Sequence, residues 1–506
     1  MPGFNSLNRS LVNGAGGSLS INPFGSLNSA EQIATAQATF VYGTNTTQWT
    51  TSSIGSGAAV TVANGIVTCS SGISTSGSAG VRLRRGVKYR AGQGVIGKIT
   101  AIFDPGVASS TQVAGFGNPE CGYYFARPGT NFGILHVDTA KREVRKLTIS
   151  AAGGTENVTI TLDGVSKTFA IIGGSNVNQT SFLIGEQDYS QLGYGWDAES
   201  IDGEIYFISL RARSLTGSYG ITTSGTASGS FSIVQSGVIP NQTFITQSQW
   251  NIDKLDGTGA SRITLDPTKG NIYSVGYQYL GFGNAVFSVE DPNKGILVPV
   301  HQIENANSRS SIVLRNPHTF ARWSATNAGS STSVSIKGAS AATFVEGVVS
   351  RNIGPCFATG SIKTGVTTTI VPLLSIRANQ VFKDQTCYVE LDPYNISVGA
   401  DFTNASNTNL LNVYVYRNAL LSGPVNFAYV NSELSACAAD LSATGVTFGP
   451  LTQLVKSFTV AANSSETLSI LAGEFYIGPR ETLTVAGRTT GNTATVTANL
   501  SWYEDQ

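Results

Sequence analysis

The sequence predicts an all-β protein made of tandem antiparallel β-sandwich domains of jelly-roll type, with an extended N-terminal arm. Short segments in which apolar and polar residues alternate recur along the chain, and Gly-rich turns separate them. Gly, Ser, Thr, Asn and Val are abundant, whereas the chain has a single Met and few runs of the residues that favour helices. Many short strands joined in this way are typical of two-sheet sandwiches and jelly rolls.

The length of 506 residues exceeds that of a single compact domain. Composition and turn signals divide the chain into an arm, β domains and a linker. The expected boundaries are 1–35 for the arm, 36–213 for a first sandwich, 214–229 for a Gly-, Ser- and Thr-rich linker, 230–354 for a second β domain and 355–506 for a C-terminal sandwich.

The first sandwich contains the clearest local signals. Residues 95–103 alternate apolar and polar side chains, as a half-buried strand does. Residues 158–162 and 165–171 are strand-like and are separated only by Asp163 and Gly164. Asp-Gly is the pair that a two-residue type I′ turn prefers, so these segments are predicted to form a β-hairpin.

The later domains have weaker but similar patterns. Strands are expected at residues 368–376, 411–416 and 493–502 in the C-terminal sandwich. In the second domain, residues 277–283 combine aromatic side chains with two glycines. We interpret this segment as an aromatic strand in which glycine relieves crowding, because it is too short for a phosphate-binding loop.

The charges are few and balanced. Charged residues make up 12% of the chain, about half the usual quarter, and 31 Lys and Arg residues match 31 Asp and Glu residues. A protein that coats nucleic acid needs an excess of basic residues, so no nucleic-acid partner is expected. A net charge of zero favours association, and a homo-oligomer, with a trimer favoured, is expected. No apolar run is long enough to predict a membrane span.

Cysteine and histidine give no sign of a metal or redox centre. The five cysteines form no CxxC pair and are expected to be small buried thiols. The chain has three histidines, His136, His301 and His318, without HExxH spacing. A Ser-His-Asp triad is left open by the sequence, although no Gly-x-Ser-x-Gly elbow occurs. No catalytic residue, metal or cofactor is expected, and the protein is predicted not to be an enzyme.

One basic cluster stands out in the first sandwich. It comprises Arg82, Arg84, Arg85, Lys88, Arg90 and Lys98. A phosphate-binding patch would need such a positive surface. Since the whole chain is neutral, a solvated strand and turn is the preferred interpretation, with a contact between subunits as the alternative.

The candidate binding site lies in a loop-rich stretch that combines carboxylates with aromatic rings. Its carboxylates are Glu186, Asp188, Asp197, Glu199, Asp202 and Glu204, and its rings are Tyr189, Tyr194 and Trp196. The predicted glycan contact comprises Tyr189, Tyr194, Trp196, Asp197 and Glu199, because sugar rings stack on aromatic faces while hydroxyl groups need fixed polar partners. The alternatives are structural turns around Trp196, a calcium site and a glycosidase acid pair.

The stretch from Trp250 to Gly347 resembles a known family. It contains Trp250, Asp256-Gly257, Asp266-Pro267, Leu280-Gly281-Phe282-Gly283, Pro299-Val300-His301 and Phe344-Val345-Glu346-Gly347 in that order. This block is similar to one in virion proteins of large DNA viruses of algae and of some tailed phages. The ending Ser501-Trp502-Tyr503-Glu504-Asp505 has a counterpart in the same proteins. The resemblance implies a place in a virus particle and partners among other virion proteins, without implying a reaction.

Three hypotheses about function follow. The first is a non-enzymatic structural component of a virion, namely a capsid-associated spike, fibre, penton or tail subunit that assembles through its β domains. The second is a carbohydrate-binding module for host attachment. The third is a surface polysaccharide hydrolase, which would need a pair of acids in a cleft.

Overall fold

The computed structural model describes residues 32–87, 89, 92–347, 354–403, 409–471 and 474–504. The described chain is built from antiparallel sheets with little helix, so the predicted all-β class is confirmed. It forms two compact units, each assembled from segments distant in sequence. The first unit comprises Met1–Asn118, Gly122–Asp138 and Gln242–Val349, and the second comprises Pro119–Cys121, Thr139–Asn241 and Ser350–Gln506.

The first unit is a sandwich of two large sheets. The nine-stranded sheet contains β1 (Gln32–Thr39), β3 (Ala59–Ala63), β4 (Ile66–Ser70), β6 (Val95–Phe103), β18 (Asn271–Tyr277), β19 (Ala285–Glu290), β20 (Leu297–Ile303), β22 (Ser335–Gly338) and β23 (Ser340–Glu346). The seven-stranded sheet contains β2 (Trp49–Ile54), β5 (Ser78–Leu83), β7 (Ser110–Gly117), β8 (Gly122–Pro128), β9 (Gly133–Asp138), β17 (Asn241–Thr246) and β21 (Phe320–Asn327).

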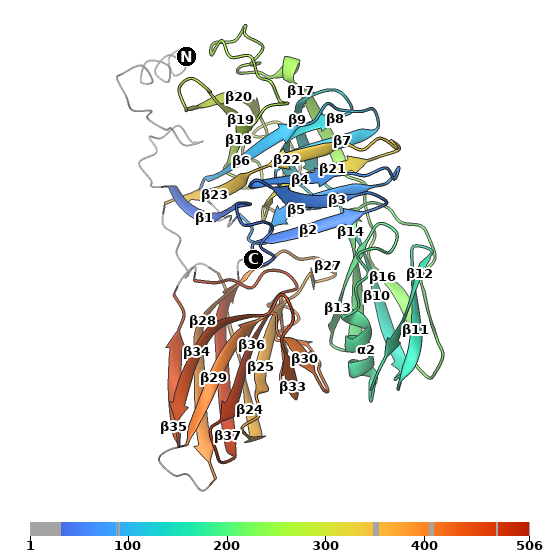
Figure 1. Ribbon diagram of the computed structural model, residues 1–506, viewed down its shortest axis with the longest axis vertical. Coiled ribbons are helices and arrows are strands. Elements are labelled where there is room, and N and C mark those ends of the chain that lie inside the picture. The colour runs from blue at the N-terminus through green and yellow to red at the C-terminus, as the bar shows by residue number, and fades with distance from the viewer. Residues whose placement is uncertain are drawn as a thin grey trace. The chain divides into compact units, whose positions relative to one another are not determined.

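Strands from the two ends of the first unit alternate within each sheet. Strand β21 pairs with both β5 and β7, β22 with β4 and β6, and β23 with β1 and β6. Figure 1 shows this as yellow strands lying among blue ones. The expected domains 36–213 and 230–354 therefore differ from the structure, because strand pairing joins residues that a division along the sequence separates.

The core of the first unit follows from strand alternation. Strand β6 alternates buried and partly exposed residues along its whole length, as its sequence pattern predicts. Aromatic rings fill the space between the sheets, and Phe125 packs against Tyr273 with ring centroids 4.5 Å apart. Trp250, which opens the stretch that resembles virion proteins, is also buried in this core, beside Phe125 and Phe132.

The second unit begins with a small sandwich formed by residues 139–241. One sheet contains β10 (Arg142–Ala151), β13 (Trp196–Ile201), β14 (Glu204–Ala212) and β16 (Ser228–Gln235), and the other contains β11 (Glu156–Leu162), β12 (Val165–Ile171) and β15 (Gly220–Thr223). The predicted hairpin is confirmed, because β11 and β12 pair up to Leu162 and Val165, with Asp163 and Gly164 both at positive φ.

Two features of this sandwich differ from the sequence-based expectation. Residues 214–229 are not only a linker, since they contain β15, which pairs with β11, and the start of β16, which pairs with β10. A short helix, α2 (Val177–Gly185), was not predicted. Its N-cap is Asn176, whose side chain accepts a hydrogen bond from the Gln179 amide, a recognised start signal for a helix.

The C-terminal part of the second unit is an eight-stranded jelly roll with added short strands. One sheet has the order β24 (Cys356–Val366), β37 (Ala494–Glu504), β28 (Leu391–Phe402) and β35 (Ser464–Ser469). The other sheet continues from β31 (Ala428–Tyr429) and β32 (Cys437–Asp440) through β25 (Val371–Ala378), β36 (Thr482–Thr489), β29 (Leu410–Arg417) and β34 (Gln453–Ala461). Short pairs join β26 (Val381–Phe382) to β27 (Gln385–Thr386) and β30 (Leu420–Ser422) to β33 (Gly445–Thr447).

The strand order of this domain identifies its topology. When its eight main strands are lettered B to I in chain order, the two sheets have the orders B-I-D-G and C-H-E-F. This is a double Greek key, so the predicted jelly-roll architecture is present here. The orange and red strands in Figure 1 show the domain.

Other expectations concern the ends of the chain and the membrane. The predicted arm at 1–35 falls mostly outside the described residues, and its last four residues already belong to strand β1. Among the described helices, none is long and apolar enough to cross a membrane. Of the five cysteines, four are buried thiols as expected, and Cys356 is exposed.

Candidate functional site

The aromatic residues of the predicted glycan contact lie mainly in the core. Tyr189 and Trp196 are each 1% exposed and pack with Phe207 inside the small sandwich. The Tyr189 hydroxyl donates a hydrogen bond to the Ile184 carbonyl. Tyr194 is half-buried, and the Arg213 guanidinium carbon lies 3.7 Å from its ring centroid. These rings are therefore occupied by the protein and do not form an exposed platform.

The two carboxylates of the predicted contact stabilise the second unit. Asp197 on β13 forms an ion pair of 2.7 Å with Arg480. Glu199 is fully buried and accepts hydrogen bonds from the backbone amides of Gln380 and Val381, at 2.9 and 3.0 Å. Burial raises the pKa of Glu199, and the Arg377 guanidinium opposes this effect. Both side chains thus join the small sandwich to the jelly roll.

The other acidic residues of this stretch also have structural roles. Asp188 accepts a hydrogen bond from the Ser190 amide, and Glu204 pairs with Lys146. Among the residues that the structure describes, no group of three His, Cys, Asp or Glu side chains could hold a metal ion. The structure does not bring the carboxylates of 186–204 together as a calcium site would require.

The basic cluster is divided between two sheets. Arg82 lies on β5 of the seven-stranded sheet, where its guanidinium faces the Phe320 ring, while Lys98 lies on β6 of the nine-stranded sheet. Arg84 donates a hydrogen bond from Nε to the Thr46 carbonyl. Lys88 and Arg90 lie outside the described residues. Lys98 therefore lies on a different sheet from Arg82.

The glycines of the stretch that resembles virion proteins shape a loop, not a strand. Strand β18 ends at Tyr277, and the Gly283 amide then donates a hydrogen bond to the Tyr279 carbonyl. Gly281 has φ of +79°, and a Cβ on Gly283 would lie 1.5 Å from the Gln278 oxygen. The expected aromatic strand is therefore wrong beyond Tyr277, because this backbone turns too tightly for side chains.

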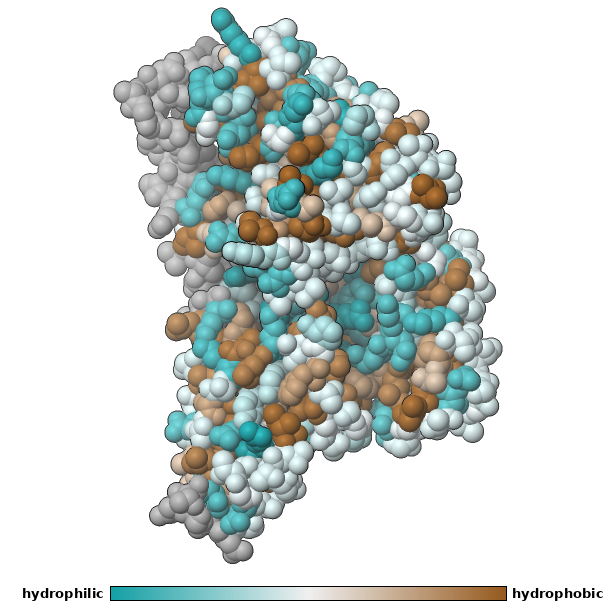
Figure 2. Space-filling model, viewed as in Figure 1, coloured by the Kyte–Doolittle hydropathy of each residue, from teal (hydrophilic) through white to brown (hydrophobic). Residues whose placement is uncertain are grey.

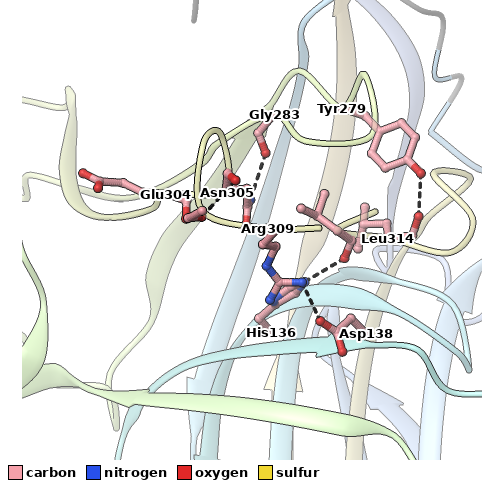
Figure 3. Close-up of polar contacts among 10 residues, drawn as sticks. His136, Asp138, Tyr279, Gly283, Glu304, Asn305, Arg309 and Leu314 are labelled. Carbon is pink, nitrogen blue, oxygen red and sulfur yellow. Dashed lines mark hydrogen bonds and ion pairs between the residues drawn. The ribbon is translucent and has the colours of Figure 1, made fainter. Parts of the chain in front are cut away.

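This loop, residues 278–284, packs on a second loop, residues 304–319, through the contacts in Figure 3. The Tyr279 hydroxyl donates to the Leu314 carbonyl at 2.6 Å, and the Asn305 side-chain Nδ2 donates to the Gly283 carbonyl at 2.9 Å. Beneath the second loop, Arg309 forms an ion pair of 2.8 Å with Asp138 at the end of β9.

His136 on β9 supports the same loop from below. Its Nε2 lies 3.0 Å from the Val313 carbonyl oxygen, so this nitrogen carries the proton and donates it. The ring stacks on Tyr123 with centroids 4.8 Å apart. Burial lowers the pKa of His136, and the Val313 carbonyl and Asp138 oppose this effect. The imidazole is therefore neutral and structural at neutral pH.

A solvent-open groove lies on the first unit, at a position the sequence did not indicate. It has a volume of about 720 Å³ and is bounded by strands β1, β6 and β23 and by the turn that follows β1. Tyr42 stands on this turn and is 98% exposed. A tyrosine ring so completely exposed gains nothing from burial, so it is available to a ligand.

Buried aromatic residues fix the base of this turn. Phe40 and Trp49 flank it, and their rings stack with centroids 4.3 Å apart. Both rings also contact Trp323 on β21. The Gly43 amide donates to the Phe40 carbonyl, which closes the turn that carries Tyr42. The exposed ring is thus presented from a packed foundation.

Polar side chains line the same groove as the Tyr42 ring. Gln37, Asn45 and Gln48 line the groove and are exposed. The Asn45 Oδ1 accepts hydrogen bonds from the amide and hydroxyl of Thr47, at 2.9 and 2.7 Å, which fixes the amide plane. Lys98 and Glu290 add one cation and one carboxylate to the wall. The groove therefore offers donors, acceptors and an aromatic face.

Comparisons with known proteins give similarities of fold only. No family model matches the sequence, and no curated protein matches it. The potassium-bound carbohydrate recognition domain of Emp46p matches at 9% identity and TM-score 0.24, covering 63% of this chain and 100% of its own. Peanut lectin with a nine-residue peptide matches at 10% identity and TM-score 0.24, with the same coverage of 63% and 100%.

A viral protein matches over more of the chain. The triple jelly roll of an archaeal virus turret matches at 9% identity and TM-score 0.16, covering 97% of this chain and 98% of its own. At these identities and TM-scores the similarities do not define a shared function.

Replacing Trp196 by alanine tests whether this residue is core. Because the ring is buried among the strands of the small sandwich, Trp196→Ala is expected to lower the free energy of unfolding by about 3 to 5 kcal/mol. Chemical denaturation of the full chain measures this change. An unchanged stability together with a loss of glycan binding would instead support the site predicted from sequence.

Acid is expected to destabilise the first unit through His136. Because its pKa in the folded chain is lowered from 6.5, the unfolded chain binds more protons, and stability is lost as pH falls below about 6.5. The pKa of His301 is also lowered by burial and adds to this loss. As the pH is lowered from 8 to 5, the melting temperature should therefore fall less steeply for His136→Gln than for the wild type. Parallel curves would contradict the assignment.

Proposed function

We propose that this protein is a non-enzymatic subunit of a virus particle that binds carbohydrate through the Tyr42 groove. The groove carries the proposal, since it combines an exposed aromatic ring with fixed amide groups. The C–H face of a sugar ring stacks on an aromatic ring, and its hydroxyl groups pair with amides, a cation and a carboxylate. Loops and turns on a rigid sandwich are where such binding sites concentrate.

The particle location is supported by two observations. The first is the resemblance of residues 250–347 and of the chain's end to virion proteins. The second is the C-terminal jelly roll, an architecture that occurs in viral capsid proteins and in lectins. Proteins with many different functions share this fold, so the topology alone does not indicate a location. The resemblance in sequence is what points to a virus particle.

The absence of enzymatic activity is part of the proposal. Among the described residues that line the groove, Glu290 is the one carboxylate. Glycoside hydrolysis uses two carboxyl groups on either side of the scissile bond. In the region first considered for such a pair, Asp197 and Glu199 are engaged with Arg480 and with backbone amides. These contacts favour binding over hydrolysis.

Assembly into a homo-oligomer, with a trimer favoured, is also proposed. Strand β34 is the edge of its sheet, and its residue Leu454 is opposite Tyr416. Leu454, Leu420 and Phe448 are each more than half exposed, and the Phe448 ring lies 4.7 Å from that of Tyr416. Figure 2 shows such apolar patches over the jelly roll. An apolar patch beside an open strand edge is what a neighbouring subunit covers.

Light scattering at micromolar concentration tests the assembly. The full chain is expected to scatter as an oligomer, and a double variant with Leu454→Ser and Phe448→Ser is expected to shift toward the chain mass of 52.9 kDa. Ile252→Ser, in a loop of the first unit and with its side chain 49% exposed, serves as the control. A wild-type protein that remains a stable monomer would exclude the homo-oligomer.

Glycan binding is tested at Tyr42. Tyr42→Ala is expected to weaken binding on a glycan array and in calorimetry by about three- to tenfold, the range that aromatic contacts contribute. Since the side chain is 98% exposed, the melting temperature should not change. Tyr42→Phe keeps the ring and should retain binding. Equal affinity of the wild type and Tyr42→Ala would remove the groove as the binding site.

A further inference from the structure

A second hollow adjoins the Tyr42 groove on the first unit. It has a volume of about 270 Å³ and shares Thr100 and Ile272 with the groove. Its other lining residues include Ile66, Ile102 and Gly270. The two spaces are therefore neighbours on the surface of the first unit.

The polar groups around the hollow are already engaged by the protein. The Thr100 hydroxyl oxygen accepts hydrogen bonds from the amides of Ala339 and Ser340, both at 2.9 Å. The Asn271 side-chain amide donates to the carbonyls of Asp266 and Lys269, also at 2.9 Å. A sugar hydroxyl placed in the hollow would lose water without gaining these partners, which is unfavourable.

The remaining surface is aliphatic. Ile66, Ile102 and Ile272 surround the hollow, and Gly270 adds no side chain. A methyl group would gain free energy by leaving water for such surroundings. The groove and the hollow together therefore match a ligand with a polar ring and an apolar substituent.

We propose that the carbohydrate bound in the Tyr42 groove carries an apolar substituent, an O-methyl or 6-deoxy methyl group, which occupies the hollow beside Ile272. This inference rests on the proposed carbohydrate-binding function and names the class of sugar. Each buried methyl group should tighten binding about fourfold relative to the same sugar without it.

The test compares matched pairs of glycans on wild type and one variant. Gly270→Leu fills the hollow, and its Cβ would meet only the Ile102 side chain, at 4.0 Å, so the fold should tolerate it. The variant should lose the preference for O-methylated or 6-deoxy sugars and still bind the plain sugars. Gly154→Leu is the matched control, because a Cβ there has no neighbour within 4 Å and lies in the second unit.

The outcomes separate this inference from the function on which it rests. If the wild type binds plain and substituted sugars equally, or if Gly270→Leu keeps the preference, the hollow does not hold the substituent and this inference is overturned. Loss of binding in Tyr42→Ala would then still support the groove. If the wild type binds no glycan of either kind, the proposed function and this inference both fail.

Discussion

The pairing of strands β21, β22 and β23 with the N-terminal strands is the constraint on which the first unit depends. Each of these strands lies between two strands more than 200 residues away in sequence. Without them, β5 and β7 would not share a sheet, and β1 would have no partner. Closing such long loops costs conformational entropy, which is recovered only when the complete sheets pack on one another.

This pairing also builds the groove. One wall comes from β1 and its turn, another from β23, and the floor from β6, which pairs with β23. Trp323 on β21 connects these parts, because its ring packs on Phe40 and Trp49 while its Nε1 donates to the Thr100 carbonyl at 2.8 Å. Trp323 therefore contacts both the residues that flank the Tyr42 turn and Thr100, which lines the groove and the hollow.

The second unit uses its polar residues differently. Glu199 is removed from water and held by two backbone amides of the jelly roll, and Arg377 of the jelly roll donates in return to the Ser200 carbonyl. Around them, Phe182 and Ile201 pack against Val425 and Phe427. A buried carboxylate is stable only with such partners, and it therefore fixes the orientation of the two domains within this unit. The small sandwich thus belongs to the second unit, whereas a domain division along the sequence would assign most of it to the first domain.

The sequence by itself determined the local structure. Alternating residues set β6, and Asp163 with Gly164 set the β11–β12 hairpin, because side-chain periodicity and turn geometry depend only on neighbours in the chain. Only the tertiary structure decided which strands pair across the chain and which aromatic residues remain exposed. Trp196 and Tyr42 both have polar neighbours in the sequence, yet Trp196 lies in the core and Tyr42 in solvent. Burial depends on what packs against a residue: other residues of the small sandwich enclose Trp196, whereas the Tyr42 side chain is 98% exposed.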